Sequence, residues 1–294
     1  MNSDPCGSRP PAFRLPEATR LGSIQLQVAD LERSVEWYQR VLGFRTVESR
    51  GADAALATSG AGDVLLRLRE VSGSRPVPRE GRIGLYHFAI LLPDRAHLGA
   101  LLPHLARHGV RPGASDHHVS EALYLSDPDG LGIEVYADRP RDRWICRDGQ
   151  LHMTTEPLDL ADLQAAAAPT WQGLPDGTAI GHIHLFVTDL DDASAFYHQA
   201  LGFDRMVWNY PGALFLAAGG YHHHLGTNTW ARHATAAGPG DARLLEWTVR
   251  LPSQGDVAAA AAALDTAGFP TSTHGEDHGV VDPWGNRVRL SSSA

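Results

Sequence analysis

The sequence lacks an apolar run that could cross a membrane, because a spanning helix needs about 18 or more consecutive apolar residues. The longest apolar run, Val257 to Leu264, is rich in alanine and predicts a buried helix. The N-terminus has neither the basic start nor the apolar core of a signal peptide. We therefore expect no membrane partner, and we interpret residues 1–18 as a flexible, proline-rich tail.

An excess of positive charge is also missing, since the formal net charge is −9. Nucleic-acid binding needs concentrated Lys and Arg, so we expect no nucleic-acid partner. Cysteine is scarce, and Cys6 and Cys146 are the two present. They form neither a disulfide framework nor a zinc pattern, which favours a reducing compartment and predicts a cytoplasmic protein. The sequence allows a homo-oligomer without specifying one.

Histidine, by contrast, is abundant, and the chain repeats itself. There are 16 histidines, and they cluster. Residues 23–44 and 182–203 are identical at 9 of 22 positions, at an offset of 159 residues. The same offset aligns residues 85–110 with 244–269. The chain is therefore a tandem duplication, which must be recognised before the fold is predicted.

Each half contains two similar units of strand, helix and three further strands, which predicts an α+β fold of four βαβββ modules. The opening strand alternates apolar and polar residues, as a strand with one buried face does. Asp30 and Asp189 then cap a helix, and Gly43 and Gly202 end it where a left-handed residue is needed. The units run over residues 21–70, 84–138, 180–230 and 243–291.

The predicted domains follow from this repeat. They are the tail (1–18), a first half of two modules (19–138), a connecting segment (139–178) and a second half of two modules (179–294). The connecting segment carries several prolines and a candidate helix over residues 158–168. A connection of that length is uncommon in a compact domain, so we expect it to fold over the surface.

One segment, residues 116–141, carries a specific motif. It contains His117, the pair Leu123-Tyr124, the turn Asp127-Pro128-Asp129-Gly130, and Glu134. Together with the four modules, it resembles the vicinal oxygen chelate superfamily, which includes glyoxalases, bleomycin-resistance proteins and type I extradiol dioxygenases. The segment is most similar to catechol 2,3-dioxygenases. Ser115 departs from their usual pattern.

In modules of this kind the first and last strands line a cup, and strand alternation decides which side chains face it. Phe88 belongs to the aliphatic side that faces the helix, so we expect His87 to point into the cup. The same argument places His182 and His184 there. It also places Glu134 there from a closing strand, and a buried carboxylate needs a cation.

The duplication makes this set informative, because neither half contains all of it. The first half has His87 and Glu134, and the second half has His182. The duplicates of these three positions are, in the same order, Glu246, Arg289 and Ser23. A complete site therefore requires the second and third modules to share one cup.

The resemblance identifies His87, Glu134 and His182 as the metal ligands, with His182 preferred over His184. Two histidines and one carboxylate form the set typical of non-haem iron(II), with manganese(II) as the alternative metal. The set leaves coordination positions open for a chelating substrate and dioxygen. The implied partners are a small aromatic diol and O₂, as in the catabolism of aromatic compounds.

The proton chemistry of such a reaction needs groups with tunable pKa values beside the metal. The resemblance assigns His117 and Tyr124 to such roles. It also places an acid–base histidine on the strand that ends the third module, where motif spacing favours His223 and strand parity favours His224. We expect an extradiol dioxygenase acting on a catechol or hydroquinone. The alternatives are a glyoxalase-like isomerase or lyase, and a metal-free small-molecule binding protein.

Overall fold

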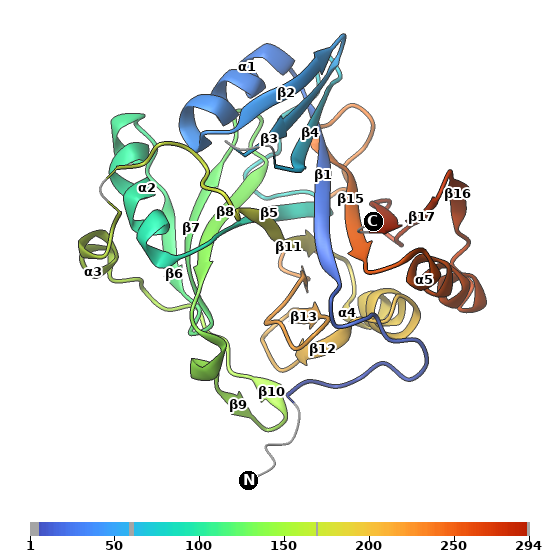
Figure 1. The fold of residues 1–294 in the computed structure, drawn as a ribbon. Coiled ribbons are helices and arrows are strands. Elements are labelled where there is room, and N and C mark those ends of the chain that lie inside the picture. Colours follow the sequence, from blue (N-terminus) through green and yellow to red (C-terminus); the bar gives the residue numbers. More distant parts are fainter. Residues whose placement is uncertain (1–5, 59–61, 169, 293–294) are drawn as a thin grey trace.

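The computed structural model describes residues 6–58, 62–168 and 170–292, and its main features are two eight-stranded sheets (Figure 1). The first sheet joins strands of the first and fourth modules, and the second sheet joins strands of the second and third. This confirms that the second and third modules pair with each other. The division of the chain into a tail, two halves and a connecting segment stays a prediction.

The first sheet has the order β16-β17-β18-β15-β1-β4-β3-β2. Its strands are β1 (Arg20–Val28), β2 (Arg45–Arg50), β3 (Asp53–Ala57), β4 (Val64–Glu70), β15 (Arg243–Leu251), β16 (Ser272–His274), β17 (Asp277–Val281) and β18 (Arg287–Ser292). The opening strands β1 and β15 meet antiparallel at its centre, and each pairs in parallel with the closing strand of its own module.

The second sheet repeats this plan in the order β12-β13-β14-β11-β5-β8-β7-β6. Its strands are β5 (Gly84–Leu92), β6 (Gly113–Asp116), β7 (Ser120–Ser126), β8 (Gly132–Asp138), β11 (Ala179–Phe186), β12 (Asp204–Val207), β13 (Ala213–Ala217) and β14 (Leu225–Asn228). Here β5 and β11 meet antiparallel at the centre, with β8 and β14 parallel to them on either side.

The helices follow their opening strands as the capping residues predict. The Asp30 carboxylate accepts from the backbone N–H of Arg33, and Asp189 accepts from those of Asp191 and Asp192. Gly43 ends its helix at a φ of 80°, a conformation that glycine adopts without strain. The helical segments are α1 (Leu31–Trp37), η1 (Tyr38–Leu42), α2 (Arg95–Arg107), η2 (Arg141–Arg143), α3 (Leu160–Ala165), α4 (Leu190–Ala193), η3 (Ser194–Ala200) and α5 (Gln254–Thr266).

One continuous apolar core lies between the helices and the aliphatic faces of both sheets. Two buried tyrosines tie consecutive modules together within it. Tyr38 donates to Asp127 at 3.1 Å, and Tyr197 donates to Asp282 at 2.5 Å. Burial raises the pKa of Asp127 to about 7. The aspartates of the two Asp-Pro-x-Gly turns therefore join neighbouring modules. The core covers one face of each sheet, so the opposite face can carry a functional site.

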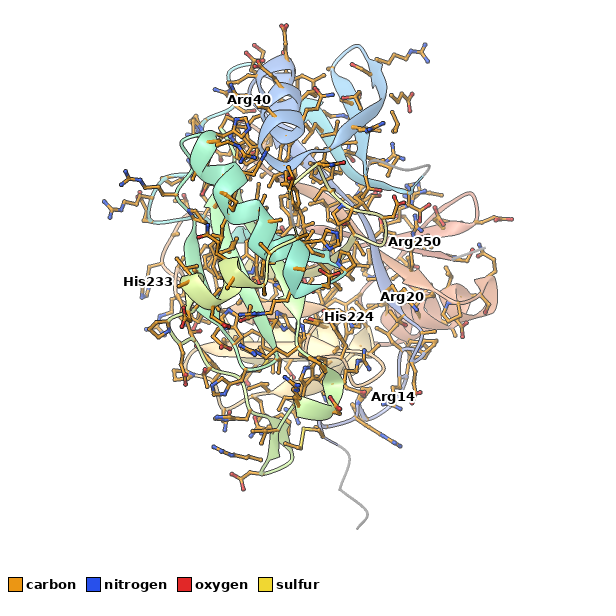
Figure 2. All side chains as sticks on the ribbon, turned by 60° about the vertical axis from the view of Figure 1, so that its left-hand side comes forward. Arg14, Arg20, Arg40, His224, His233 and Arg250 are labelled. Carbon is orange, nitrogen blue, oxygen red and sulfur yellow. A yellow bond between two sulfur atoms is a disulfide. The ribbon has the colours of Figure 1, made fainter. Side chains whose placement is uncertain are left out.

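The N-terminal segment differs from the expected loose tail over its described residues. Leu15 is buried in the core. Arg14, which Figure 2 labels, forms a bidentate ion pair with Asp204 on β12. Cys6 is disulfide-bonded to Cys146, which corrects the expectation that the two cysteines form no disulfide.

The physical reason for the disulfide is the path of the segment. The backbone N–H of Gly7 donates to the carbonyl of Gly149 at 2.7 Å, which brings the segment against the hairpin of β9 (Cys146–Arg147) and β10 (Gln150–Leu151). The cysteine content therefore no longer supports a cytoplasmic location, which stays a prediction.

Part of the connecting segment packs against the first half, where Gly173 lies against Gly43 at the end of η1. The candidate helix within it is the shorter α3, which packs against α2. Among the described residues, no helix combines the length and the apolar character needed to span a membrane.

Candidate metal centre

Three neighbouring strands at the centre of the second sheet carry the predicted ligands. His87 lies on β5, Glu134 on β8 and His182 on β11. Phe88, beside His87, is fully buried in the apolar core, so alternation turns His87 to the opposite face. The pairing of β11 and β8 with the two edges of β5 then brings all three side chains together.

The geometry of this cluster suits one metal ion. Nε2 of His87 lies 3.0 Å from Oε2 of Glu134, and Nε2 of His182 lies 3.1 Å from the same oxygen. One ligand atom from each residue lies within 4.8 Å of the other two. All three side chains are buried, with 6% or less of each exposed. The cluster is therefore a compact, largely dry set of two imidazoles and one carboxylate.

The electrostatics of the cluster favour the protonation states that a metal requires. Burial alone would raise the pKa of Glu134, but its interactions with the imidazoles of His182 and His87 outweigh burial and hold that pKa well below its usual range. Burial lowers the pKa values of His87 and His182. Glu134 is therefore charged and the histidines are neutral near pH 7, as metal ligands must be.

Unsatisfied nitrogen atoms provide the test of whether a metal fits. Nε2 of His87 is buried and close to Glu134, yet it makes no aligned hydrogen bond with any described residue. Buried polar atoms without a partner are uncommon and call for an explanation. A divalent cation among His87, Glu134 and His182 accounts for this atom and for the buried charge together.

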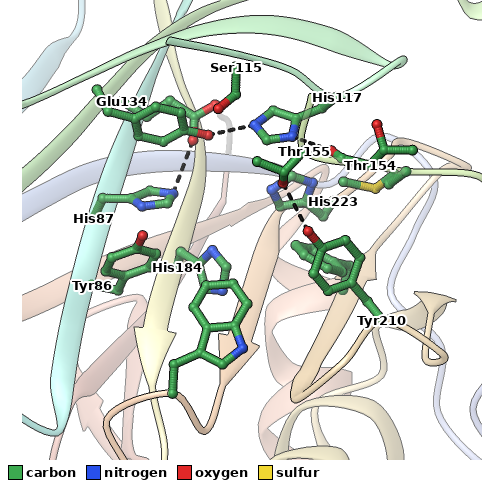
Figure 3. Close-up of a pocket in the computed structure, with 14 residues that line it drawn as sticks. Tyr86, His87, Ser115, His117, Glu134, Thr154, Thr155, His184, Tyr210 and His223 are labelled. Carbon is green, nitrogen blue, oxygen red and sulfur yellow. Dashed lines mark hydrogen bonds and ion pairs between the residues drawn. The ribbon is translucent and has the colours of Figure 1, made fainter. Parts of the chain in front are cut away.

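A cavity of about 290 Å³ opens directly onto the cluster (Figure 3). Its lining includes His87 and Glu134, and it also includes His184, which alternates with His182 along β11. The Asn228 amide lies 3.0 Å from Nε2 of His184, so it donates to that nitrogen. His184 is thus in the cup, as strand alternation predicts, but outside the group of potential ligands.

His117 and Tyr124 both line this cavity, and they contact each other. Nδ1 of His117 lies 2.6 Å from the carbonyl oxygen of Thr154 and must donate to it. In the neutral tautomer, Nε2 of His117 is then free to accept from the Tyr124 hydroxyl at 2.7 Å. Burial and the charge of Glu134 raise the pKa of Tyr124 well above its ordinary value, so the phenol keeps its proton.

His223 also lines the cavity and packs against His182, with ring centroids 4.1 Å apart and the rings tilted by 44°. Burial lowers its pKa well below the usual value, so it is neutral near pH 7. Behind it, Nδ1 of His223 lies 2.7 Å from Nδ1 of His222, and Nε2 of His222 lies 2.9 Å from Oδ1 of Asp138.

This hydrogen-bonded chain determines the tautomer of His223. The Asp138 carboxylate can only accept, so Nε2 of His222 carries a proton. Nδ1 of a neutral His222 then accepts from Nδ1–H of His223. Nε2 of His223 is left without a proton, as a general base requires.

His224 lies elsewhere, in a second cavity beside Arg141 and Asp138. Strand parity had favoured His224 for the cup, and this was wrong because β14 begins only at Leu225. The residues before it lie in a bend, where alternation does not hold. Motif spacing favours His223, and His223 is the one of the two that lines the cavity.

The corresponding face of the first sheet carries no such cluster among the described residues. At the duplicated positions, Arg289 forms an ion pair with Glu246 at 3.8 Å and a closer one with Asp277. An arginine and a serine cannot replace a carboxylate and an imidazole as ligands, so this cup differs in chemistry, as the sequence predicts.

Some residues of the site escaped the sequence analysis. The connecting segment supplies Met153, Thr154 and Thr155 to the cavity wall, although nothing in its composition indicates this. His222 and Asp138 also escaped, because their partnership joins residues 84 positions apart. The run of three histidines was the one available signal for His222.

Comparisons with known proteins agree with this architecture. The model of the glyoxalase/bleomycin resistance protein/dioxygenase superfamily matches residues 20–135 and 179–290. A catechol-2,3-dioxygenase of Bacillus subtilis (strain 168) is 46% identical over 272 residues, which cover 91% of this chain and 95% of that protein. A biphenyl-2,3-diol 1,2-dioxygenase of Rhodococcus globerulus is 28% identical over 160 residues, 51% of this chain and 84% of that one.

Solved structures resemble the fold. A structure described as a putative dioxygenase from Bacillus subtilis has a TM-score of 0.66 at 12% identity, covering 95% of this chain and 86% of its own. Glyoxalase I from Zea mays has a TM-score of 0.56 at 18% identity, covering 93% and 92%. At these identities the likeness establishes the fold alone.

Proposed function

The chain belongs to the glyoxalase/bleomycin resistance protein/dioxygenase superfamily, and we propose that it is an iron(II)-dependent extradiol dioxygenase that opens the ring of a catechol with dioxygen. The observation that carries this proposal is the convergence of His87, Glu134 and His182 beside a cavity that His87 and Glu134 line. The similarity to a catechol-2,3-dioxygenase over 91% of the chain supports the same reaction.

The three residues would hold the metal, and the bound ion would supply a Lewis-acidic centre for the ring oxygens and for dioxygen. Two histidines and a carboxylate are the set of non-haem iron(II) oxygenases, which leave further positions open. Manganese(II) is the alternative metal.

The acid–base group in this proposal is His223. Its neutral, unprotonated Nε2 is suited to accept the proton of a catechol hydroxyl, and the resulting imidazolium can return it later. Asp138 and His222 act through His223 by fixing its tautomer. His117 and Tyr124 line the cavity, and the Tyr124 hydroxyl, which donates to His117 in the free protein, can instead turn its proton to a substrate oxygen.

The composition of the site argues against the two alternatives. Glyoxalase-like enzymes commonly use two carboxylates, whereas Glu134 is the one carboxylate in the cavity lining of the described residues. A metal-free binding protein would have to bury the Glu134 charge between two neutral histidines, which is costly.

The metal assignment is tested by elemental analysis of the purified protein after anaerobic loading with iron(II). We expect about one iron per chain, and almost none in Glu134→Ala, because three ligands are needed to hold the ion. Glu246→Ala, which removes a carboxylate from the corresponding cup of the first sheet, is the matched control and should bind iron normally. Full iron content in Glu134→Ala would mean that this carboxylate is not a ligand.

A further inference from the structure

The hairpin of β9 and β10 stands apart from both eight-stranded sheets. Each of its strands has two residues, and together they form a sheet of their own. Figure 1 shows the hairpin below the large sheets, beside the dark-blue N-terminal segment. Residues 145–149, which include β9 and the turn, are all exposed. A two-stranded hairpin is at best marginally stable by itself in water, so its order depends on links to the rest of the chain.

The N-terminal segment supplies such a link at the tip of the hairpin. Cys6 is disulfide-bonded to Cys146 on β9, and the backbone hydrogen bond from Gly7 to the hairpin lies beside this bond. The next residue, Ser8, pairs with Arg205 on β12 through two backbone hydrogen bonds of 2.7 and 2.9 Å. The segment therefore joins the hairpin to the second sheet, and the disulfide is the covalent part of this connection.

The other end of the hairpin leads into the wall of the cavity beside the metal cluster. Soon after β10 come Met153, Thr154 and Thr155, which line the cavity and are here called the wall segment. The hydroxyls of Thr155 and Tyr210 lie 2.9 Å apart, within hydrogen-bond distance (Figure 3). Cys6, Met153 and Tyr210 all pack against one buried cluster of side chains. The disulfide and the wall segment thus share the same packing environment.

The position of the disulfide lets a thiol from solution open it, because Cys146 is exposed while Cys6 is half-buried. A thiolate that attacks the Cys146 sulfur forms a mixed disulfide and releases Cys6 as a thiol. A second thiol then resolves the mixed disulfide. Two thiols are thereby oxidised to one disulfide, while Cys6 and Cys146 are both reduced to thiols. The chain has two cysteines, so it offers no competing pairing within itself.

We propose that the disulfide between Cys6 and Cys146 is a redox-sensitive clamp on the cavity, and that a thiol reductant weakens ligand binding by opening it. The identity of the ligand, a catechol, rests on the proposed function. With the disulfide closed, the wall segment is ordered before the ligand arrives. With the disulfide open, part of that order must be gained on binding, at a cost in affinity. A reducing compartment opens the clamp and an oxidising one closes it.

Hydrogen exchange of the iron-loaded wild type tests the structural step. The protein is reduced with dithiothreitol, a dithiol, separated from it by desalting under argon, loaded with iron(II) and compared with the oxidised form. We expect the backbone amides of residues 144–155 to exchange at least about tenfold faster after reduction, because the hairpin then opens locally. The amides of β5 should be unchanged, which shows that the fold is retained. Equal exchange of residues 144–155 in the two forms would overturn the inference.

Anaerobic calorimetry with catechol tests the binding step on the same two forms. Reduction should raise Kd by about threefold or more, because ordering even one or two side chains on binding weakens affinity by that factor. Iron content should stay the same, since His87, Glu134 and His182 lie on strands of the second sheet. Reoxidation should restore the original Kd. The same Kd in both forms would contradict the clamp.

Cys6→Ser keeps the clamp permanently open and separates it from any other action of the reductant. This variant should show the fast exchange and the raised Kd of the reduced wild type, with or without treatment by dithiothreitol. Ser8→Ala is the matched control, because it alters the same segment and leaves the disulfide in place, and it should behave as the oxidised wild type. Cys6→Ser with the exchange and the Kd of the oxidised wild type would refute the role of the disulfide.

Exchange and calorimetry do not depend on turnover, which keeps this inference separate from the proposed reaction. If reduction loosens residues 144–155 and weakens catechol binding but the iron-loaded protein consumes no oxygen, the proposed reaction fails while the clamp stands. If the protein consumes oxygen with catechol and shows the same Kd for it in both redox forms, the clamp fails while the reaction stands.

Discussion

Replacing Asp138 by Asn tests whether the chain from Asp138 through His222 to His223 prepares the base. Asp138 Oδ1 accepts from His222 at 2.9 Å, and the imidazole of His222 is fully buried while the carboxylate is 28% exposed. An amide at this position has lost the charge and can present a donor to Nε2 of His222. That donor would reverse the tautomers of both histidines and put a proton on the Nε2 of His223 that faces the cavity.

The structure sets limits on the size of this effect. Loss of a hydrogen bond to a charged group is worth about 1.5–3 kcal/mol, which corresponds to a rate loss of about 10- to 100-fold. Reversal of a catalytic tautomer costs up to about 10⁴-fold where it has been isolated in another enzyme. We therefore expect kcat of Asp138→Asn to fall by between about 10- and 10⁴-fold. Iron content should be unchanged, because Asp138 is not among the ligands.

The assay is oxygen uptake by the iron-loaded protein with saturating catechol, measured across a range of pH. The matched control is Tyr221→Phe, since the Tyr221 hydroxyl also donates to Asp138, at 3.2 Å, and its removal leaves the bond to His222 in place. This control should keep kcat within about threefold of the wild type. Wild-type kcat in Asp138→Asn with an unaltered pH profile would show that Asp138 does not set the tautomer of His223.

Three further predictions concern other parts of the chain. His223→Ala should retain iron and lose about 10²- to 10⁴-fold in turnover, whereas His224→Ala should change turnover little; the reverse order would contradict the assignment. Burial lowers the pKa of His224 to about 3 from about 6.5 when unfolded, so its contribution to stability is complete above about pH 6.5 and lost as pH falls towards 3. Between pH 7 and pH 5, the free energy of unfolding of His224→Gln, measured in urea, should therefore fall by about 2 kcal/mol less than that of the wild type. An equal fall in both proteins would count against this. Cys6→Ser should lower the free energy of unfolding by about 2–4 kcal/mol, because the disulfide to Cys146 closes a long loop, and an unchanged urea midpoint would show that the link contributes nothing.

The cluster of His87, Glu134 and His182 could be predicted from the sequence because two independent patterns agree on it. Strand alternation turns His87 and Glu134 away from the apolar core, and the duplication shows that neither half keeps a full set. Because His87 and Glu134 need His182 in the same cup, the second and third modules were predicted to pair. The order of strands in the second sheet confirms this pairing.

Features that depend on the path of irregular segments could not be predicted. The disulfide joins residues 140 positions apart through a segment without periodicity. Strand alternation wrongly placed His224 in the cup, because the chain bends before β14 begins. Met153 reaches the cavity from the connecting segment, and its placement depends on tertiary contacts such as that between Thr155 and Tyr210.

The proposed reaction inserts both atoms of dioxygen into a catechol ring at the cluster of His87, Glu134 and His182. The most direct measurement supplies ¹⁸O₂ to the iron-loaded protein with catechol and determines both oxygen uptake and the mass of the product. We expect one O₂ to be consumed per catechol and a ring-opened product that carries both labelled atoms, with neither observed in Glu134→Ala. Unchanged catechol after incubation of the iron-loaded wild type, or a product without the label, would contradict it.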